Sequence, residues 1–369
     1  MKIVYLGRYN YSEILGGPEK VAKRIYSHLS DKCINSIFIE YFFEGKKYSI
    51  KEKLFGKKIF NTTGNKIVYR LGLIRLLFFL IKIKPDLIHV ITFERFSIIS
   101  IVYKILYRVK LVYTVHGVIV DENKIQNQGI SHIYIIKDIL VEKSLFRFAD
   151  RAIFLSEISI QAAQRYYKIN DDKVVIIPNG IDNIFYRKEL HKNDNEEEFN
   201  IVFVGNTNRK GKGFDLLLSA LKEVKFRANL YVVSELSETK FLNENGLIKI
   251  FFVNKMDTEA FAKFLNDKHF FISASLFDSF SLTAIEAMAA GVIPVVTRET
   301  GMARFIIHRE SGFIYDYGNY KTLANLLTQL SSDMELRKRV SNNAKLIYNL
   351  LSWDKIIEQY IFLYKEIIN

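Results

Sequence analysis

Residues 270–297 read FFISASLFDSFSLTAIEAMAAGVIPVVT and give the clearest indication of the fold class. The apolar runs Phe270–Ala274 and Ile293–Thr297 have the length and the β-branched or aromatic composition of buried strands. Between them lies a helix-length stretch that begins near Ser281 or Leu282. Strand, helix and strand in this order are typical of a parallel βαβ unit, so the chain is predicted to belong to the α/β class.

The same alternation of strands and amphipathic helices extends over the rest of the chain. The charged segment Arg187–Glu198 (RKELHKNDNEEE) interrupts it and is interpreted as a linker. Because 369 residues are too many for one ordinary core, we predict two Rossmann-like, doubly wound domains facing a cleft, at residues 1–187 and 199–350. The first domain is expected to have strands at Lys2–Leu6, Ile34–Tyr41, Asp86–Ile91, Lys110–Val115, Ala152–Ser156 and Val174–Pro178. The second is expected to have further strands at Asn200–Val204, Asn229–Ser234, Ile248–Val253 and Gly312–Tyr315.

The last predicted helix runs from Ser352 or Trp353 to Ile368 and is amphipathic, so it needs a surface to cover. Its apolar side carries Ile356, Ile357, Tyr360, Leu363 and Tyr364.

The cysteine content and the apolar runs indicate a cytosolic protein. The single cysteine, Cys33, cannot form an internal disulfide, and the chain shows no N-terminal signal pattern. The longest apolar run, Leu71–Ile83, is interrupted by Arg75 and Lys82 and is shorter than the ~20 residues of a membrane span.

The formal charge of +13 is concentrated in the first half of the chain. Residues 1–186 hold about 29 Lys and Arg against about 17 Asp and Glu, whereas the remainder is near balance. This excess suits an anionic membrane surface, and a merely solubilising basic face is the alternative. Nucleic acid is disfavoured, because the cations are not arrayed with aromatic residues in a recognisable binding module. Much of the excess lies at Lys46, Lys47, Lys51, Lys53, Lys57, Lys58, Arg70, Arg75, Lys82 and Lys84.

Ligands of open parallel sheets bind beyond the carboxyl ends of the strands, so the turns after strands are candidate sites. Gly16 and Gly17 precede a predicted helix, where backbone N–H groups can approach an anion. His116 follows the strand Lys110–Val115 and can donate a hydrogen bond to a ligand oxygen. Both features also have a purely structural explanation, the first as a tight turn and the second as a satisfied buried histidine.

Two turns of the second domain are more specific. Residues 205–213 read GNTNRKGKG after a strand, and three cations among glycines suit a diphosphate, with a solvated basic loop as the alternative. The turn is not a P-loop, because the GxxxxGK[ST] spacing is absent. After Phe270–Ala274, Asp278 precedes a helix and Glu286 lies about one turn into it, so two carboxylates flank a helix N-terminus. Asp278 as a plain N-cap would leave Glu286 unexplained.

These segments resemble, in order, the landmarks of glycosyltransferase family 4, whose members have the GT-B fold. The stretch LFDSFSLTAIEAMAAGVIPVVT at residues 276–297 is similar to the family signature, in which seven residues separate a carboxylate from a glutamate. The other landmarks resemble GGPEKVA at 16–22, KPDLIHV at 84–90, IPNGID at 177–182 and SWDKI at 352–356. The resemblance spans most of the chain and implies that residues 353–369 pack back onto the first domain.

The resemblance implies a retaining, metal-independent glycosyltransferase that binds a nucleotide diphosphate sugar, UDP by default, on the second domain and a saccharide acceptor on the first. Glu286 would hold the ribose, and Asp278 a hydroxyl of the donor sugar. His116 would lie near the reacting carbon, while Arg209 and Lys212 would neutralise the diphosphate. The remaining candidate contacts to the nucleotide are Gly16, Gly17, Asn206, Asn254, Lys255, Met256, Phe280, Ser281, Leu282 and Thr283.

Three positions depart from the family pattern. The family usually has glutamate at Asp278, so the carboxylate is drawn back here by ~1.5 Å. The usual glycine is Ser281, and an arginine common after the strand glycine is Asn206. Arg209 is expected to replace that arginine from a loop one residue longer.

The predicted reaction moves a hexose or N-acetylhexosamine to a saccharide acceptor, expected to be lipid-linked, in surface polysaccharide assembly. No Asp-x-Asp pair or His/Cys cluster is present in the sequence, so cationic side chains would take the place of a metal. Two alternatives stay open, a non-hydrolysing sugar-nucleotide epimerase and a catalytically silent saccharide-binding protein of the same fold.

Overall fold

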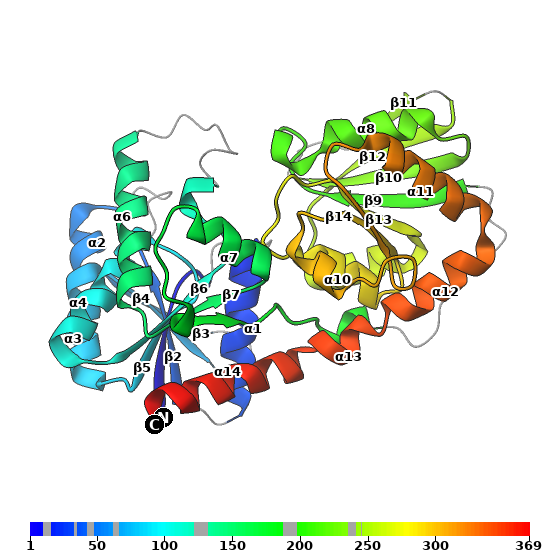
Figure 1. The fold of residues 1–369 in the computed structure, drawn as a ribbon. Helices are drawn as coiled ribbons and strands as arrows, with labels where there is room; N and C mark the ends of the chain where they lie inside the picture. Colours follow the sequence, from blue (N-terminus) through cyan, green and yellow to red (C-terminus); the bar gives the residue numbers. More distant parts are fainter. Residues whose placement is uncertain are drawn as a thin grey trace. The chain divides into compact units, whose positions relative to one another are not determined.

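The computed structural model describes residues 1–9, 16–32, 35–42, 48–61, 66–121, 132–186, 198–234, 241–244 and 246–369. The chain divides into two compact units (Figure 1). The N-terminal unit comprises Met1–Asn179 and Trp353–Asn369, and the C-terminal unit comprises Gly180–Ser352. The division therefore falls inside IPNGID rather than in the predicted linker, of which residues 187–197 lie outside the described part of the chain. That the two domains face a common cleft stays a prediction.

Within the described residues, the N-terminal unit is built on an eight-stranded sheet of order β3-β4-β2-β1-β5-β6-β7-β8. Among these eight described strands, only β3 runs antiparallel to its neighbour. The strand order reverses between β1 and β5, which is a topological switch point. The strands are β1 Lys2–Leu6, β2 Asn35–Tyr41, β3 Lys57–Asn61, β4 Ile67–Leu71, β5 Leu87–Val90, β6 Lys110–Val115, β7 Arg151–Phe154 and β8 Val174–Ile176. The helices are α1 Gly17–Asp31, α2 Ile50–Phe55, α3 Leu73–Ile83, η1 Arg95–Ser97, α4 Ile98–Tyr107, α6 His132–Phe148, α7 Glu157–Gln164, η2 Asp171–Lys173 and α14 Trp353–Ile368.

In the described part of the C-terminal unit, a seven-stranded sheet has the order β11-β12-β10-β9-β13-β14-β15, again parallel except for an edge strand, β11. Its switch point lies between β9 and β13. The strands are β9 Glu198–Val204, β10 Arg227–Ser234, β11 Phe241–Glu244, β12 Ile248–Asn254, β13 Phe270–Ser273, β14 Ile293–Thr297 and β15 Phe313–Tyr315. The helices are η3 Asn183–Phe185, η4 Lys210–Lys212, α8 Phe214–Glu223, α9 Thr258–Phe264, η5 Leu265–Asp267, α10 Leu282–Ala289, η6 Gly301–Phe305, α11 Tyr320–Ser332, α12 Met334–Ala344 and α13 Ile347–Leu351.

Both sheets confirm the predicted α/β class with two Rossmann-like domains, and the strands that were not predicted are β3, β4 and β11. The antiparallel edge strand β3 begins with Lys57 and Lys58, and lysines on an edge strand discourage pairing with another chain. In β4, Arg70 is buried and donates to the carboxylate of Glu40 at 2.8 and 3.1 Å. Arg70 is therefore not available to an anionic surface, contrary to the prediction.

The last helix, α14, packs against α1 in the N-terminal unit, and its predicted apolar side is buried. A buried polar group fixes its position. His89 of β5 forms a hydrogen bond of 2.7 Å with the hydroxyl of Tyr364 in α14 and another of 2.7 Å with the hydroxyl of Thr114 in β6. Since both ring nitrogens are satisfied inside the core, this network specifies where the helix docks.

Candidate functional site

The basic turn at Gly205–Gly213 follows β9 at the switch point of the C-terminal sheet. Asn206 closes the turn, because its backbone carbonyl accepts from Arg209 N at 3.1 Å and its side-chain oxygen from Asn208 N at 2.9 Å. The side-chain oxygen of Asn206 is thus engaged within the turn. Arg209 is half-buried, and its Nε has no hydrogen-bond partner among the residues that the structure describes.

Direct backbone contact joins this turn to the loop that follows β13. Leu276 N donates to the carbonyl of Gly211 at 2.8 Å. Gly213 has φ +68°, and a Cβ at this position would lie 1.9 Å from the carbonyl oxygen of Ala274. Only glycine permits both the left-handed backbone and this close approach, so the two turns meet because residue 213 has no side chain.

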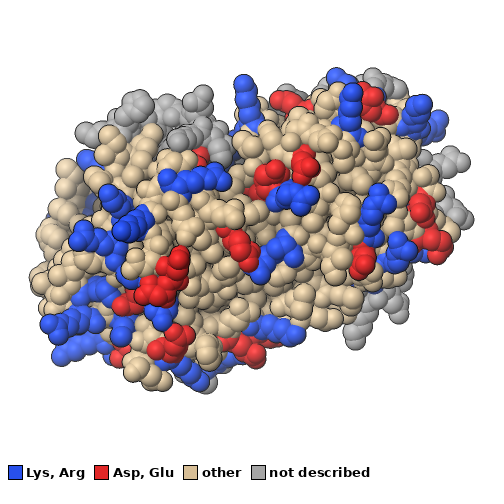
Figure 2. Space-filling model, viewed as in Figure 1, with Lys and Arg blue, Asp and Glu red and all other residues tan. Residues whose placement is uncertain are grey.

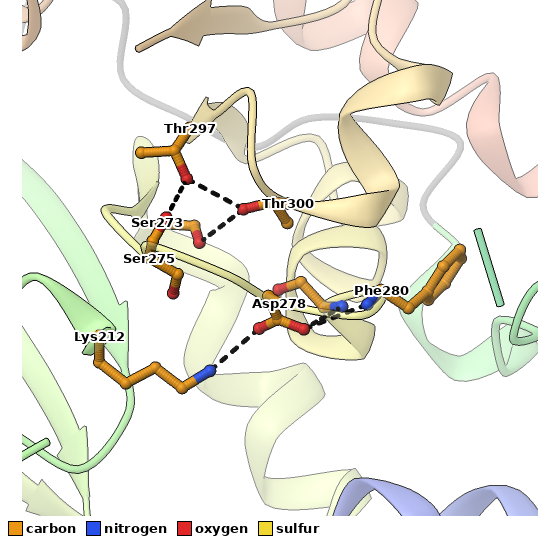
Figure 3. Close-up of polar contacts among 8 residues, drawn as sticks. Lys212, Ser273, Ser275, Asp278, Phe280, Thr297 and Thr300 are labelled. Carbon is orange, nitrogen blue, oxygen red and sulfur yellow. Dashed lines mark hydrogen bonds and ion pairs between the residues drawn. The ribbon is translucent and has the colours of Figure 1, made fainter. Parts of the chain in front are cut away.

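Lys212 and Asp278 lie where the two turns meet (Figure 3). The Nζ of Lys212 is 3.0 Å from Oδ2 of Asp278, and the two side chains are 30% and 19% exposed. The other carboxylate oxygen, Oδ1, accepts from the backbone N–H groups of Phe280 at 3.2 Å and Ser281 at 2.9 Å. Asp278 therefore caps its own loop through the amides of two residues that the family resemblance places among the nucleotide contacts.

Ser281 is the N-cap of α10 and has a left-handed backbone, with φ 66° and ψ 78°. This conformation costs a residue with a side chain on the order of 1–2 kcal/mol. The family's usual glycine at this position is explained, since glycine adopts it without strain. Leu282 and Thr283 begin the helix and are partly exposed, at the end where the helix dipole favours an anion.

Glu286 lies within α10 and is 2% exposed. A glutamate is rarely buried unless its carboxylate is bound or serves a function. Its predicted contact with a ribose stays a prediction.

A layer of buried hydroxyl groups lies next to the loop that carries Asp278 and was not predicted (Figure 3). Thr297 donates to the carbonyl of Ser275 at 2.7 Å and lies 3.1 Å from the hydroxyl of Thr300. The backbone of Asp278 is held on both sides, because its N–H donates to Glu299 O at 3.2 Å and its carbonyl accepts from Gly301 N at 2.8 Å. The turn after β14 thus fixes the loop that carries Asp278.

The candidate nucleotide contacts Asn254, Lys255 and Met256 lie at the end of β12, at the same carboxyl edge of the sheet. Lys255 N donates to the carbonyl of Ser234, the last residue of β10, at 3.1 Å. Asn254 is exposed, whereas Lys255 and Met256 are half-buried.

The predicted glycines of the N-terminal unit lie at the start of α1, with Gly16 as the N-cap and Gly17 as the first helical residue. Glu19 occupies the first turn, and Arg8, just beyond β1, pairs with it at 3.4 Å. Arg8 also donates through Nε to Glu94, which follows β5. Arg8 and Glu94 therefore span the switch point of this sheet, and neither was predicted.

His116 follows β6, and its ring donates to the backbone carbonyl of Ile91. Its Nε2 is buried and has no partner in the described part of the chain. Burial lowers the pKa of His116 to about 4, so the ring is neutral near pH 7. With Nδ1 as the donor to Ile91, Nε2 is left as an acceptor. That His116 contacts the donor sugar stays a prediction.

Glu142 of α6 anchors the segment after His116 and was not predicted. This fully buried carboxylate accepts from the backbone N–H of Ile119 at 3.1 Å. It also accepts from the hydroxyls of Tyr167 at 2.6 Å and Tyr113 at 3.2 Å. The only sequence signal is an acidic residue among apolar helix positions.

Acidification is expected to loosen the N-terminal unit. Burial lowers the pKa of His89 to about 3 and that of His116 to about 4, from 6.5. Below pH 6.5 the two histidines take up protons in the unfolded chain but stay neutral in the folded unit. The stability of the folded unit therefore falls as the pH falls. We expect the hydrogen-exchange protection of β5 and β6 to drop roughly tenfold for each histidine between pH 6.5 and about pH 5, after correction for intrinsic rates.

The control for this effect is His89→Gln, which keeps polar groups opposite Tyr364 and Thr114 but does not titrate. This variant should remove about half of the pH-dependent loss of protection, measured on a logarithmic scale. An unchanged loss in this variant would show that His89 is not the titrating group.

Two family models match almost the whole chain, Glycosyltransferase Family 4 over residues 15–183 and Glycosyl transferases group 1 over residues 185–347. An uncharacterized glycosyltransferase of Methanocaldococcus jannaschii is 25% identical over 243 residues, which cover 64% of this chain and 66% of that protein. The capsular polysaccharide biosynthesis glycosyltransferase CapM of Staphylococcus aureus is 26% identical over 203 residues, covering 50% and 52%. The matched part thus spans about two thirds or less of these relatives.

Solved structures resemble the chain over its full length. Sucrose-phosphate synthase from Thermosynechococcus elongatus superimposes with a TM-score of 0.76 at 16% identity, covering 99% of both chains. Anabaena HepE in complex with UDP-glucose gives a TM-score of 0.74 at 18% identity, covering 99% of this chain and 100% of HepE.

The two Rossmann-like sheets and the solved structures that resemble them show the GT-B fold. The two family models show that the chain is a glycosyltransferase. Within that class, the chain belongs to glycosyltransferase family 4.

Proposed function

We propose that this protein transfers a hexose or N-acetylhexosamine from a nucleotide diphosphate sugar, with UDP as the expected nucleotide, to a saccharide acceptor. The observation that carries the proposal is the junction of the basic turn and the start of α10, where Lys212 lies 3.0 Å from Asp278. The solved relatives support the donor class, since HepE binds UDP and UDP-glucose and starch synthase IV of Arabidopsis thaliana binds ADP.

In the proposed reaction the bond between the sugar and the phosphate breaks, and negative charge develops on the departing diphosphate. Lys212, Arg209 and the N-terminus of α10 stabilise this charge, as fixed donors do at other active sites. The anomeric configuration is retained, and a leaving phosphate oxygen accepts the proton of the acceptor hydroxyl. Because cationic side chains balance the charge, EDTA should leave activity intact. NMR of the product tests whether the anomeric configuration is retained.

The proposed acceptor is a lipid-linked saccharide of surface polysaccharide assembly at the inner face of the cell membrane. This agrees with CapM, named for capsular polysaccharide biosynthesis, and with WaaG, named for lipopolysaccharide biosynthesis.

A thermal-shift screen of nucleotide diphosphates tests the donor site. A ligand at 100 times its dissociation constant adds about 2.7 kcal/mol of stability, which raises the unfolding temperature of a unit of this size by roughly 5–10 °C. We expect a shift of this size with one nucleoside diphosphate, and little with the nucleoside alone. No shift with any nucleoside diphosphate would contradict the proposal. Binding without turnover of any nucleotide sugar would instead indicate a saccharide-binding protein.

A further inference from the structure

Helices α3, α4 and α6 lie side by side in the N-terminal unit and expose large apolar side chains. Phe78 of α3 is 66% exposed, Leu106 of α4 is 63% exposed and Leu140 of α6 is 56% exposed. Ile105 and Ile136 on the same helices are also exposed. We call the outward surface of these three helices the α3–α4–α6 face.

Cations share the helix sides that carry these apolar residues. On α3, Arg75, Phe78 and Lys82 are exposed at intervals of three and four residues, so they lie on one side of the helix. On α6, Leu140, Lys143 and Arg147 have the same spacing and are all exposed. The face is therefore both apolar and basic, not apolar at one end and basic at the other.

Acidic side chains do not offset these cations. Helices α3 and α4 contain no Asp or Glu. In α6, Asp138 is paired with Arg95 at 2.9 Å and Glu142 is buried. Figure 2 shows Lys and Arg gathered over the region where Figure 1 places α3 and α4. Among the described residues of the three helices, the exposed charges are all positive.

We propose that the α3–α4–α6 face docks on an anionic lipid bilayer surface. Its apolar side chains enter the boundary between headgroups and acyl chains, while Lys and Arg extend to the lipid phosphates. Within the described residues, the chain has no helix of the length and apolarity that crossing a bilayer requires. Docking is thus in the plane of the interface, and it involves the N-terminal unit, whereas the candidate nucleotide site belongs to the C-terminal unit.

The charge pattern disfavours two other occupants. In a symmetric dimer the same patch lies on both copies, so each cationic face would oppose another without a carboxylate to compensate. RNA or DNA would neutralise the cations but would leave Phe78, Leu106 and Leu140 against a charged phosphate backbone. An anionic bilayer satisfies both kinds of side chain.

Sedimentation of the full-length protein with lipid vesicles tests the proposal. We expect binding to phosphatidylcholine vesicles that contain phosphatidylglycerol and little binding to phosphatidylcholine alone. The double variant Leu106→Ser/Leu140→Ser should weaken binding by about tenfold or more. Each neutralised cation should weaken it about fivefold, so Lys143→Gln/Arg147→Gln should weaken it roughly 25-fold.

Matched controls lie on α14, which packs against α1. Phe362 is 72% exposed and Lys365 is also exposed, so Phe362→Ser and Lys365→Gln remove the same kinds of group elsewhere on the unit. Both should bind vesicles as the unmodified protein does. Equal loss in controls and face variants, or no vesicle binding at all, would overturn the proposal.

Two further outcomes would also overturn it. The first is a dimer, detected by sedimentation velocity, that Leu106→Ser/Leu140→Ser converts to a monomer. The second is RNA binding, detected by a filter assay, that these substitutions abolish. Because the face variants leave the C-terminal unit unchanged, they should keep the thermal shift with nucleotide diphosphates. Failure of docking is thereby distinguished from failure of the proposed transferase function.

Discussion

Replacing Lys212 by alanine is expected to slow sugar transfer by roughly 10²–10³-fold, because one fixed donor to a developing anion contributes about 2.7–4 kcal/mol at other active sites. The side chain lies in the turn after β9 and reaches the loop before α10, where its Nζ is 3.0 Å from Asp278. The loss should appear in kcat, since the charge on the departing diphosphate is largest in the transition state. It is measured as the rate of nucleotide diphosphate release with the best donor from the thermal-shift screen.

Lys210→Ala is the matched control, because it removes the same charge from the same turn at an exposed position. Its effect should be within a few-fold. Asp278→Asn separates two roles of Lys212. If the lysine acts only by holding Asp278, Asp278→Asn should cost as much as Lys212→Ala, and the double variant no more. That result, or full activity in Lys212→Ala, would remove Lys212 from the diphosphate site.

The place of the site in the C-terminal unit could be predicted from the sequence. Glycines and cations after one strand, and a carboxylate ahead of a helix after another, indicate turns at the carboxyl edge of a sheet. The structure puts these strands, β9 and β13, next to each other, so the turns meet. That β9 and β13 are neighbours follows from the topology of the sheet, and the order of the βαβ units along the chain constrains this topology.

The partners of individual side chains could not be predicted. Glu142 bonds to Ile119 and Tyr167, which lie 23 and 25 residues away, and no local pattern specifies such pairs. The edge strand β3 was missed because its sequence, KKIFN, lacks the apolar run of a central strand.

The departure at Asp278 illustrates the same limit. From the sequence, a shorter carboxylate implied only a displacement of ~1.5 Å. In the structure, that shorter side chain accepts from the amides of Phe280 and Ser281, two and three residues further on. Such local capping is typical of aspartate and less accessible to glutamate. A phosphate at these amides has to replace the carboxylate, and Lys212, already beside Asp278, is placed to pair with the incoming phosphate.

Gly213→Ala is expected to destabilise the C-terminal unit by more than about 4 kcal/mol and to abolish its thermal shift with nucleotide diphosphates. The added Cβ would lie 1.9 Å from the carbonyl oxygen of Ala274 and 2.8 Å from its carbonyl carbon. These are backbone atoms at the end of β13, so the clash is relieved only by separating the two turns. Separation breaks the bond between Leu276 N and Gly211 O and moves Lys212 away from Asp278.

Gly318→Ala isolates the steric part of this effect. Gly318 lies in the same unit and also has a left-handed backbone, with φ +85°. Apart from its chain neighbours, no atom of the described residues lies within 4 Å of its added Cβ. It should therefore cost only the backbone strain, about 1–2 kcal/mol, and leave nucleotide binding intact. The unfolding free energy of both variants in urea, with the nucleotide thermal shift, measures the difference. If Gly213→Ala were no more harmful than Gly318→Ala, the close contact between the turns after β9 and β13 would not be what assembles the site.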